Sequence, residues 1–178
     1  MQTYAIYGQE NDSNLANLQA LKLHTFLVRD NTRRVQICLS PQNQCLLLHQ
    51  VFDLTDYQKE VKKLESLGRH PELTRFLGRY DNRQIYLTEY SRIGSLKAFL
   101  ARATQQGVRT DLLEATRLLA DLAHAMAKLQ QLAADGVGGG QPFYHGDLRA
   151  ESILLSDAME VKIDMSRSQW ATGLKKLI

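Results

Sequence analysis

Residues 143–166, FYHGDLRAESILLSDAMEVKIDMS, combine short apolar strands with polar residues at the turns between them. His145 and Asp147 share a predicted turn, Ser152 follows that aspartate by five residues, and Asp164 follows a later strand. Phosphoryl transfer needs a layout of this kind, because one carboxylate orients the acceptor hydroxyl while other polar groups hold magnesium on the phosphates. Asp147 is therefore a candidate base, and Ser152 and Asp164 are candidate magnesium ligands.

Upstream of this stretch, short runs rich in Val, Ile, Leu and Phe alternate with turn residues. Asp-Asn-Thr and Ser-Pro-Gln-Asn separate the first three runs, which predicts an antiparallel meander. Two more runs follow after one helical segment and are separated by Asp-Asn. The five predicted strands cover residues 24–30, 33–40, 44–52, 73–81 and 83–90.

Three segments have helical periodicity. The first, 55–67, opens with the predicted N-cap pair Thr55-Asp56 and ends near Gly68. The second covers 95–107. The third, 111–132, is apolar around most of its circumference, which predicts burial on most sides. Strands with one inserted helix, followed by helices and small strands, indicate an α+β arrangement in two lobes.

Composition and charge narrow the function classes. The 22 basic and 19 acidic residues give a net charge of +3 and form no concentrated basic patch, so no nucleic-acid partner is expected. Apolar stretches stay well short of the ~20 residues of a membrane span, so no membrane contact is expected. Residues 1–14 show no signal pattern, and Cys38 and Cys45 are expected to be reduced thiols. These features predict a cytoplasmic protein, with an organelle as the alternative location.

The motifs resemble those of the protein kinase family. Residues 145–152 match the catalytic-loop pattern H-R-D-L-x-x-x-N, with a Leu-Arg-Ala wording similar to Src-type tyrosine kinases, and residues 164–166 stand where Asp-Phe-Gly belongs. Glu60 resembles the glutamate of the family's C helix, and Thr88 and Glu89 match the gatekeeper and hinge positions. The resemblance implies an α+β, protein kinase-like fold with a five-stranded antiparallel N-lobe, one helix in it, and a truncated, mainly helical C-lobe.

The same resemblance implies a domain division and a set of site residues. The division is an N-terminal extension (1–23), an N-lobe (24–90), a hinge (91–94), a partial C-lobe (95–166) and a C-terminal tail (167–178). Asp147 and Arg149 take catalytic-loop positions. The implied nucleotide-binding residues are Val35, Leu47, His49, Glu60, Thr88, Glu89 and Leu154.

Several positions depart from the family pattern in the phosphate-binding loop. Val28, Asp30 and Arg33 stand where the family has glycines, and their side chains prevent the backbone N–H groups from approaching phosphates. Asp30 adds a repelling charge, for which Arg33 and Arg34 could partly compensate.

Other departures affect the lysine, adenine and metal positions. His49 stands where the family has its phosphate-gripping lysine; it could still hydrogen-bond Glu60, but it is a poor substitute for a fixed cation. Leu47 replaces a small alanine against which adenine packs, and crowding of this kind costs about 1–3 kcal/mol in a core. Ser152 replaces the metal-binding asparagine, which weakens that ligand.

These losses favour a pseudokinase: a catalytically impaired kinase-like domain that acts as a protein-interaction or regulatory module and requires no cofactor. One alternative is an active or weakly active protein kinase that uses ATP and Mg²⁺. Another is a small-molecule phosphotransferase, because His145-Gly146-Asp147 also resembles aminoglycoside and choline kinase relatives. The last is an unrelated α+β domain with a chance match. The apolar helix 111–132, or the C-terminal tail, predicts a protein partner that covers it.

Overall fold

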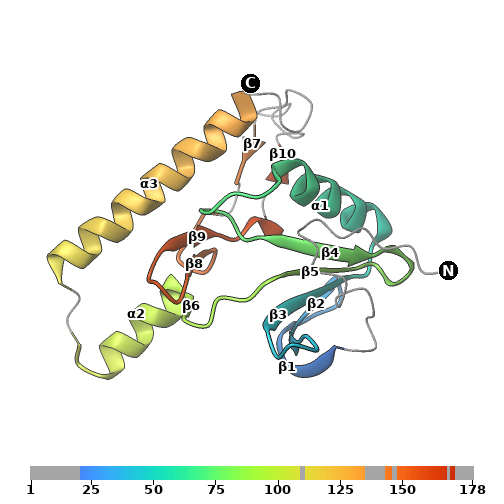
Figure 1. Cartoon of the computed structure of the whole chain (residues 1–178), viewed down its shortest axis with the longest axis horizontal. Coiled ribbons are helices and arrows are strands. Elements are labelled where there is room, and N and C mark those ends of the chain that lie inside the picture. Colours follow the sequence, from blue (N-terminus) through green and yellow to red (C-terminus); the bar gives the residue numbers. More distant parts are fainter. Residues whose placement is uncertain (1–20, 109–110, 135–142, 146–147, 168, 171–178) are drawn as a thin grey trace. The chain divides into compact units, whose positions relative to one another are not determined.

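The computed structural model describes residues 21–108, 111–134, 143–145, 148–167 and 169–170. The described residues fall into two compact units. Unit 1 contains residues 21–69 and 75–90, and unit 2 contains residues 70–74 and the described residues from 91 onward. Each unit is described by itself below (Figure 1).

Unit 1 is a sheet with one inserted helix, as the sequence predicts. Its elements are β1 (Lys22–Arg29), β2 (Arg33–Leu39), β3 (Cys45–Val51), α1 (Leu54–Leu67), β4 (Phe76–Tyr80), the short 3-10 helix η3 (Asp81–Arg83) and β5 (Ile85–Glu89). The strand order is β1-β2-β3-β5-β4, and all neighbours are antiparallel. The five-stranded antiparallel sheet and its helix are therefore confirmed.

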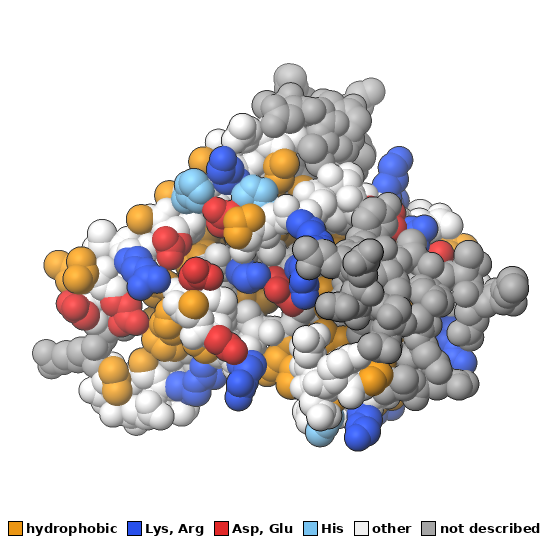
Figure 2. Space-filling view, in the orientation of Figure 1, with side chains coloured by type: hydrophobic (Ala, Val, Ile, Leu, Met, Phe, Trp, Pro, Cys, Tyr) orange, Lys and Arg blue, Asp and Glu red, His pale blue; other side chains and the backbone are white. Residues whose placement is uncertain are grey.

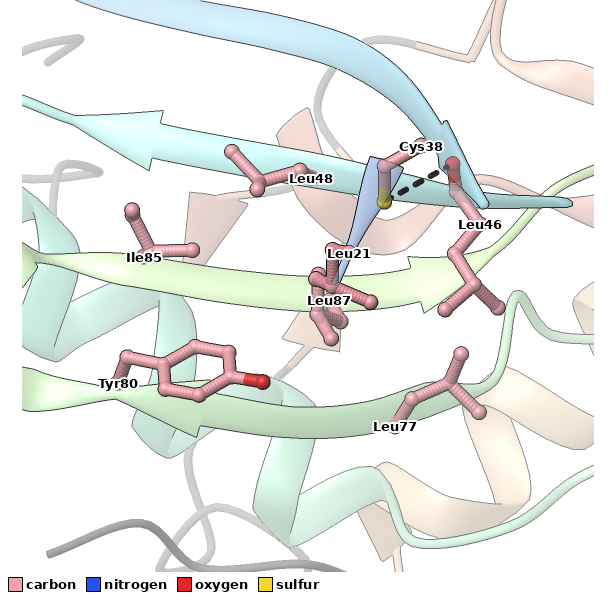
Figure 3. Packing of buried hydrophobic residues seen from close by; sticks show 8 residues of the cluster. All are labelled: Leu21, Cys38, Leu46, Leu48, Leu77, Tyr80, Ile85 and Leu87. Carbon is pink, nitrogen blue, oxygen red and sulfur yellow. Dashed lines mark hydrogen bonds between the residues drawn. The ribbon is translucent and has the colours of Figure 1, made fainter. Parts of the chain in front are cut away.

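One face of this sheet carries a continuous apolar cluster (Figure 3). Successive side chains of a strand point to opposite faces, so every second residue of β3 and β5 contributes to it. The alternate residues of the same strands point to the second face of the sheet. Its members are Leu21, Cys38, Leu46, Leu48, Leu77, Tyr80, Ile85 and Leu87.

The N-cap of helix α1 lies two residues earlier than Thr55, where the sequence predicts it. The side chain of Asp53 accepts a hydrogen bond from the Asp56 backbone N–H at 2.9 Å, so Asp53 is the N-cap and the predicted Thr55-Asp56 cap is wrong. A carboxylate placed three residues before the amide that it caps satisfies one of the free N–H groups of the first turn. The helix ends at Gly68, as predicted, where φ is +64° and glycine is favoured.

Unit 2 consists of helices and short strands. Its elements are β6 (Gly94–Ser95), α2 (Leu96–Gln105), α3 (Leu112–Ala134), β7 (Phe143–Tyr144), β8 (Ile153–Leu155), β9 (Val161–Ile163), the 3-10 helix η4 (Met165–Arg167) and β10 (Gln169–Trp170). Strands β6, β8 and β9 form one small antiparallel sheet, and β7 pairs with β10. The α+β fold class is thereby confirmed.

The segment 70–74 belongs to unit 2 because it runs beside β9. The Ile163 backbone N–H donates to the Glu72 carbonyl at 2.8 Å, and the Thr74 N–H donates back to the Ile163 carbonyl at 3.0 Å. The predicted strand 73–81 consequently begins as β4 only at Phe76. Its first residues pair with β9 instead.

Helix α3 differs from its prediction in burial. Ala125 and Leu129 are buried, but Leu112, Leu113 and Leu119 are 80%, 75% and 66% exposed. Exposed hydrophobic side chains are visible over the start of α3, at the left of Figure 2. The expectation that this helix is buried on most sides is therefore wrong for the described residues, since an apolar circumference does not ensure that neighbouring elements cover it.

Candidate functional site

Four of the predicted nucleotide-binding residues lie together on the second face of the unit 1 sheet. Val35 of β2 pairs in register with His49 of β3, and Leu47 of β3 pairs with Thr88 of β5. Residues directly opposite each other in antiparallel strands point to the same face. All four are buried. Tyr86, which pairs with His49 from β5, joins them and was not predicted from the sequence.

His49, at the position of the family's lysine, is held by two neighbours in β5. Its Nε2 lies 2.9 Å from the Thr88 hydroxyl oxygen. Its ring stacks on Tyr86 with centroids 4.6 Å apart and an interplanar angle of 7°. A buried ring fixed by a hydrogen bond and a stacked aromatic serves the packing of the sheet. This geometry gives residue 49 a structural role and directs its polar atom toward Thr88.

Glu60, the helix glutamate, has partners that the sequence did not predict. Arg33 Nη2 donates to Glu60 Oε1 at 2.6 Å, and the Tyr86 hydroxyl donates to Glu60 Oε2 at 2.9 Å. The sequence analysis allowed a hydrogen bond from His49 to Glu60; in the structure, Arg33 and Tyr86 donate to the two carboxylate oxygens of Glu60 instead. The side chains of Arg33 and Glu60 are 22% and 12% exposed, so the ion pair is partly shielded from water.

The surroundings of Arg33 stabilise the charged form of its guanidinium. Burial lowers the pKa of the Arg33 guanidinium, but the adjacent Glu60 carboxylate, with smaller contributions from Tyr86 and Asp30, raises the pKa above its ordinary value. The sequence carried a signal for the face on which Arg33 lies, although not for its pairing with Glu60. Arg33 precedes Val35 by two residues in the same strand, so both point to the face on which His49 lies.

The loop between β1 and β2 is closed by one carboxylate. Asp30 Oδ1 accepts hydrogen bonds from the Thr32 N–H at 2.8 Å, the Thr32 hydroxyl at 2.7 Å and the Arg33 N–H at 2.8 Å. The Thr32 hydroxyl bond and these two amide bonds lower the pKa of Asp30. In a glycine-rich loop such backbone N–H groups are free for phosphates. Here the carboxylate of Asp30 already occupies them.

Glu89, predicted in the hinge, is tied to the start of β4. Its Oε1 accepts from the Arg75 backbone N–H at 2.9 Å, and its own N–H donates to the Arg75 carbonyl at 3.0 Å. The residue therefore closes the end of the unit 1 sheet, where its carboxylate substitutes for one backbone acceptor.

In unit 2, Ser152 uses its hydroxyl locally. The hydroxyl donates to the Arg149 carbonyl at 3.0 Å and accepts from the Arg149 N–H at 3.0 Å, and the serine is buried. Magnesium requires near-octahedral oxygen donors that are free to turn toward it. A buried hydroxyl that closes a backbone turn in both directions fits that requirement poorly.

Asp164 is also fixed within its own turn. Its Oδ1 accepts from the Ser166 N–H at 2.9 Å, while its backbone N–H donates to the Ser152 carbonyl at 2.8 Å. The Nε2 of the buried His145 lies 2.9 Å from the Asp164 carbonyl oxygen. A side-chain bond of His145 and a backbone bond of Ser152 thus both end on the main chain of Asp164, and His145 acts here as a packed residue.

The remaining predicted positions of unit 2 are distributed differently. Asp147, the candidate base, lies outside the described residues. Arg149 is exposed beside the Ser152 turn, and Leu154 is half-buried in β8, where it pairs with Ser95 and Lys162. Within the described part of the chain, no cluster of three or more His, Cys, Asp or Glu side chains has a metal-binding geometry. Among the described helices, none combines the length and apolarity that a bilayer crossing requires.

Comparison with known proteins adds an independent finding. A sequence model of the protein tyrosine and serine/threonine kinase family matches residues 46–168. The match covers β3, α1 and all described elements up to η4. It begins after β1 and β2, so the Asp30 turn and Arg33 lie outside it.

Two curated proteins are similar to more than half of the chain. The calmodulin-binding receptor-like cytoplasmic kinase 3 of Arabidopsis thaliana is 28% identical over 111 residues, which is 61% of this chain and 20% of that protein. The RGS domain-containing serine/threonine-protein kinase A of Dictyostelium discoideum is 31% identical over 116 residues, which is 63% of this chain and 9% of that protein. The aligned region thus spans a fifth or less of each relative.

Proposed function

Because the chain belongs to the protein tyrosine and serine/threonine kinase family, we propose that it is a catalytically impaired member that acts as a protein-interaction or regulatory module. The observation that carries the proposal is the state of residue 49. Where the family places a lysine for the phosphates, this chain has a buried histidine bonded to Thr88 and stacked on Tyr86. A histidine ring in that arrangement, unlike a lysine, offers no permanently charged group to a nucleotide.

The neighbouring polar groups of unit 1 support the same proposal. Asp30 takes the backbone N–H groups of the β1–β2 loop, and Glu60 is occupied by Arg33 and Tyr86. Phosphoryl transfer depends on positioned groups that stabilise charge on the phosphates. Losing one such preorganised contact typically costs about 10²–10³ in rate. Several concurrent losses leave little catalysis.

Unit 2 supports the proposal through the candidate magnesium ligands. Ser152 closes the turn at Arg149 with both its donor and an acceptor, and Asp164 caps its own turn at Ser166. These bonds fit a structural role for both residues. We accordingly derive no step of the proposed function through a metal ion.

The interaction part of the proposal rests on the exposed side of α3. Three leucines in its first half, Leu112, Leu113 and Leu119, are largely exposed. Several large apolar side chains exposed on one helix commonly mark an interface. A protein partner that covers this side of α3 is therefore part of the proposal.

The test is a phosphoryl-transfer assay of the whole chain with ATP and magnesium, against generic peptide substrates and against itself. The matched control is Asp147→Asn, which removes the candidate base with almost no change in size. We expect equal background counts for both proteins. Transfer by the parent chain that disappears in Asp147→Asn would contradict the proposal, because only an enzyme needs that carboxylate.

A weakly active ATP-dependent kinase is the second candidate. The observation in its favour is the pair of Arg33 and Glu60, since the helix glutamate still holds a cation beside the sheet face that carries Val35. The same assay separates the two candidates.

A further inference from the structure

Strand β1 forms an open edge of the unit 1 sheet. In the order β1-β2-β3-β5-β4, its one neighbour among the described strands is β2 (Figure 1). A strand with a single neighbour pairs only part of its backbone N–H and C=O groups, and the rest point outward. Seven of its eight residues are exposed, and the eighth, Val28, is partly exposed. The described structure therefore leaves this edge accessible along its length.

The register of β1 against β2 turns two large apolar side chains to one face. Leu23 pairs with Cys38, and Phe26 pairs with Gln36. Cys38 and Gln36 are two residues apart in β2, so they share a face, which is the face of the apolar cluster. In a regular strand Leu23 and Phe26 would point to opposite faces, but the register shift between them brings both to this one. Leu23 is 59% exposed and Phe26 is 43% exposed.

Two arginines lie beside these side chains on the same face. Arg29 of β1 pairs directly with Arg34 of β2. The guanidinium carbon of Arg29 lies 5.5 Å from the centre of the Phe26 ring, and that of Arg34 lies 5.1 Å from the centre of the Phe52 ring. Like charges that stand opposite each other in antiparallel strands repel. Within the described part of the chain neither arginine forms an ion pair, so an incoming carboxylate would relieve this repulsion.

The charges around the edge are complementary to an anionic partner. The charged side chains of β1 itself, Lys22 and Arg29, are both basic. The nearest acids in the sequence are engaged by backbone N–H groups. Oδ1 of Asp30 is bound in its turn by three hydrogen bonds, and Oδ1 of Asp53 caps α1. The edge therefore combines exposed apolar side chains with basic groups that lack an acidic partner among the described residues.

These features distinguish between the possible occupants of the edge. A second copy of the chain, paired antiparallel along the whole strand, would place Lys22 of each copy opposite Arg29 of the other, which is unfavourable. A lipid surface would accept basic and aromatic side chains but would not pair with the backbone of an edge strand. An extended peptide pairs with that backbone, while its alternate side chains contact the face of the sheet. An acidic peptide therefore fits best.

We propose that β1 is a docking strand, to which an acidic, extended segment of a partner protein adds as a further strand of the unit 1 sheet. Carboxylates of that segment contact Arg29 and Arg34, and its apolar side chains pack on Leu23 and Phe26. This inference rests on the interaction part of the proposed function, but it concerns unit 1 and not the exposed side of α3. It uses the face of the sheet opposite to that of His49 and requires no nucleotide.

The experiment measures the binding of fluorescent peptides to the whole chain by anisotropy. The probes are Glu-Thr-Glu-Thr-Val-Thr-Val-Thr, which has the length of β1, and the same residues in reverse order. Each places its carboxylates and its valines on one face, and the two orders suit antiparallel and parallel pairing. We expect at least one probe to bind, more weakly in added salt, and its counterpart with Lys in place of Glu not to bind. Methylation of the backbone nitrogens of the probe should abolish binding, because an added strand pairs through its N–H groups.

Variants of the chain test the residues. The double variant Arg29→Glu/Arg34→Glu should lose the Glu probe and bind its Lys counterpart, and this exchange of partners also shows that the variant is folded. Arg83→Glu is the matched control, because it reverses the charge of an exposed arginine in η3, and it should leave the affinity nearly unchanged. Phe26→Ala should weaken binding about tenfold, as is typical of an aromatic side chain at an interface.

Equal binding of the Glu and Lys peptides would overturn the inference, as would the absence of binding at millimolar concentrations of either Glu probe. So would equal affinities of the parent and Arg29→Glu/Arg34→Glu for the Glu probe. Sedimentation of the chain as a dimer that this double variant disrupts would instead assign the edge to a second copy. Binding to vesicles of acidic phospholipid, with none to the Glu probes, would assign it to a lipid surface.

The proposed function fails on a different result, namely Asp147-dependent transfer. Binding of the Glu probe together with such transfer would reject impaired catalysis and leave the docking strand standing. Failure of the probes to bind, with no transfer by the parent chain, would reject the docking strand alone.

Discussion

Glu60 should be energetically coupled to Arg33 and much less to His49. In a kinase with the family's usual arrangement, the helix glutamate depends on the side chain at position 49. Here Arg33 Nη2 and Glu60 Oε1 are 2.6 Å apart, while His49 bonds Thr88. The perturbation is a double-mutant cycle in which Glu60→Gln is combined in turn with Arg33→Gln and with His49→Gln.

The expected magnitude follows from the distance and the burial of the pair. Two unit charges about 4 Å apart attract by about 4 kcal/mol at an effective dielectric constant of about 20. Exposed fractions of 22% and 12% mean that desolvation and solvent screening remove part of this attraction. We therefore expect a coupling free energy of about 1–3 kcal/mol between Glu60 and Arg33. Tyr86 stacks on His49 and bonds Glu60, so the second coupling is indirect along this route and should be about 0.5 kcal/mol or less.

The assay is equilibrium unfolding in urea, followed by circular dichroism, for the parent, the three single variants and the two double variants. Equal slopes against urea indicate that the variants unfold from comparable native states. A coupling of Glu60 to His49 that exceeds its coupling to Arg33 would refute the reasoning, because residue 49 would then hold the helix as lysine does in relatives.

Three further outcomes can be checked. Iodoacetamide should label Cys45 in the native chain and spare Cys38, because Cys38 is 0% exposed and burial raises the pKa of its thiol to about 12. Equal labelling rates of the two cysteines by mass spectrometry would contradict this. Ser152→Ala should lower the metal-free free energy of unfolding by about 1 kcal/mol, because the Arg149 backbone N–H loses the hydroxyl to which it donates, and an unchanged value would favour a ligand role instead. Hydrogen bonds hold the pKa of Asp30 below its ordinary value of 3.8, so the stability that this carboxylate contributes should be complete above pH 3.8 and be lost as the pH falls through the folded-state pKa. In thermal unfolding, Asp30→Asn should therefore reduce the loss of stability at acid pH. The same acid-pH dependence in parent and variant would argue against the Asp30 turn.

Local patterns in the sequence were sufficient to predict the elements of unit 1. The alternation of apolar residues in its strands has a period of two, and the helix before Gly68 has a period near 3.6; both periods depend only on residues close together in the chain. The capping of α1 was mispredicted because Asp53 and Thr55 are both good capping residues, and only the direction in which the chain enters the helix selects Asp53.

The candidate site was predictable in its residue types but not in its contacts. Resemblance to the kinase family implied that His49, Glu60 and Ser152 stand at positions that handle phosphates and metal in relatives. It could not assign Arg33 to Glu60, because these residues are 27 positions apart and meet only when the fold brings the helix glutamate to the first residue of β2.

The burial of α3 illustrates the same limit on the scale of a whole element. The sequence of this segment predicts a helix whose surface is apolar around most of its circumference. Which of those residues are covered depends on the elements packed around the helix, and Leu112 and Leu129 consequently differ completely in exposure.

The sequence by itself determined the family, the strands and helices, and the replacement of the family's lysine by histidine at position 49. Only the tertiary structure decided that Glu60 binds Arg33 and that His49 turns to Thr88. The physical reason is the separation along the chain over which each kind of interaction acts. Backbone propensity and side-chain periodicity act between near neighbours in the chain, whereas an ion pair forms wherever folding brings two charged groups within a few ångströms in a partly dehydrated place.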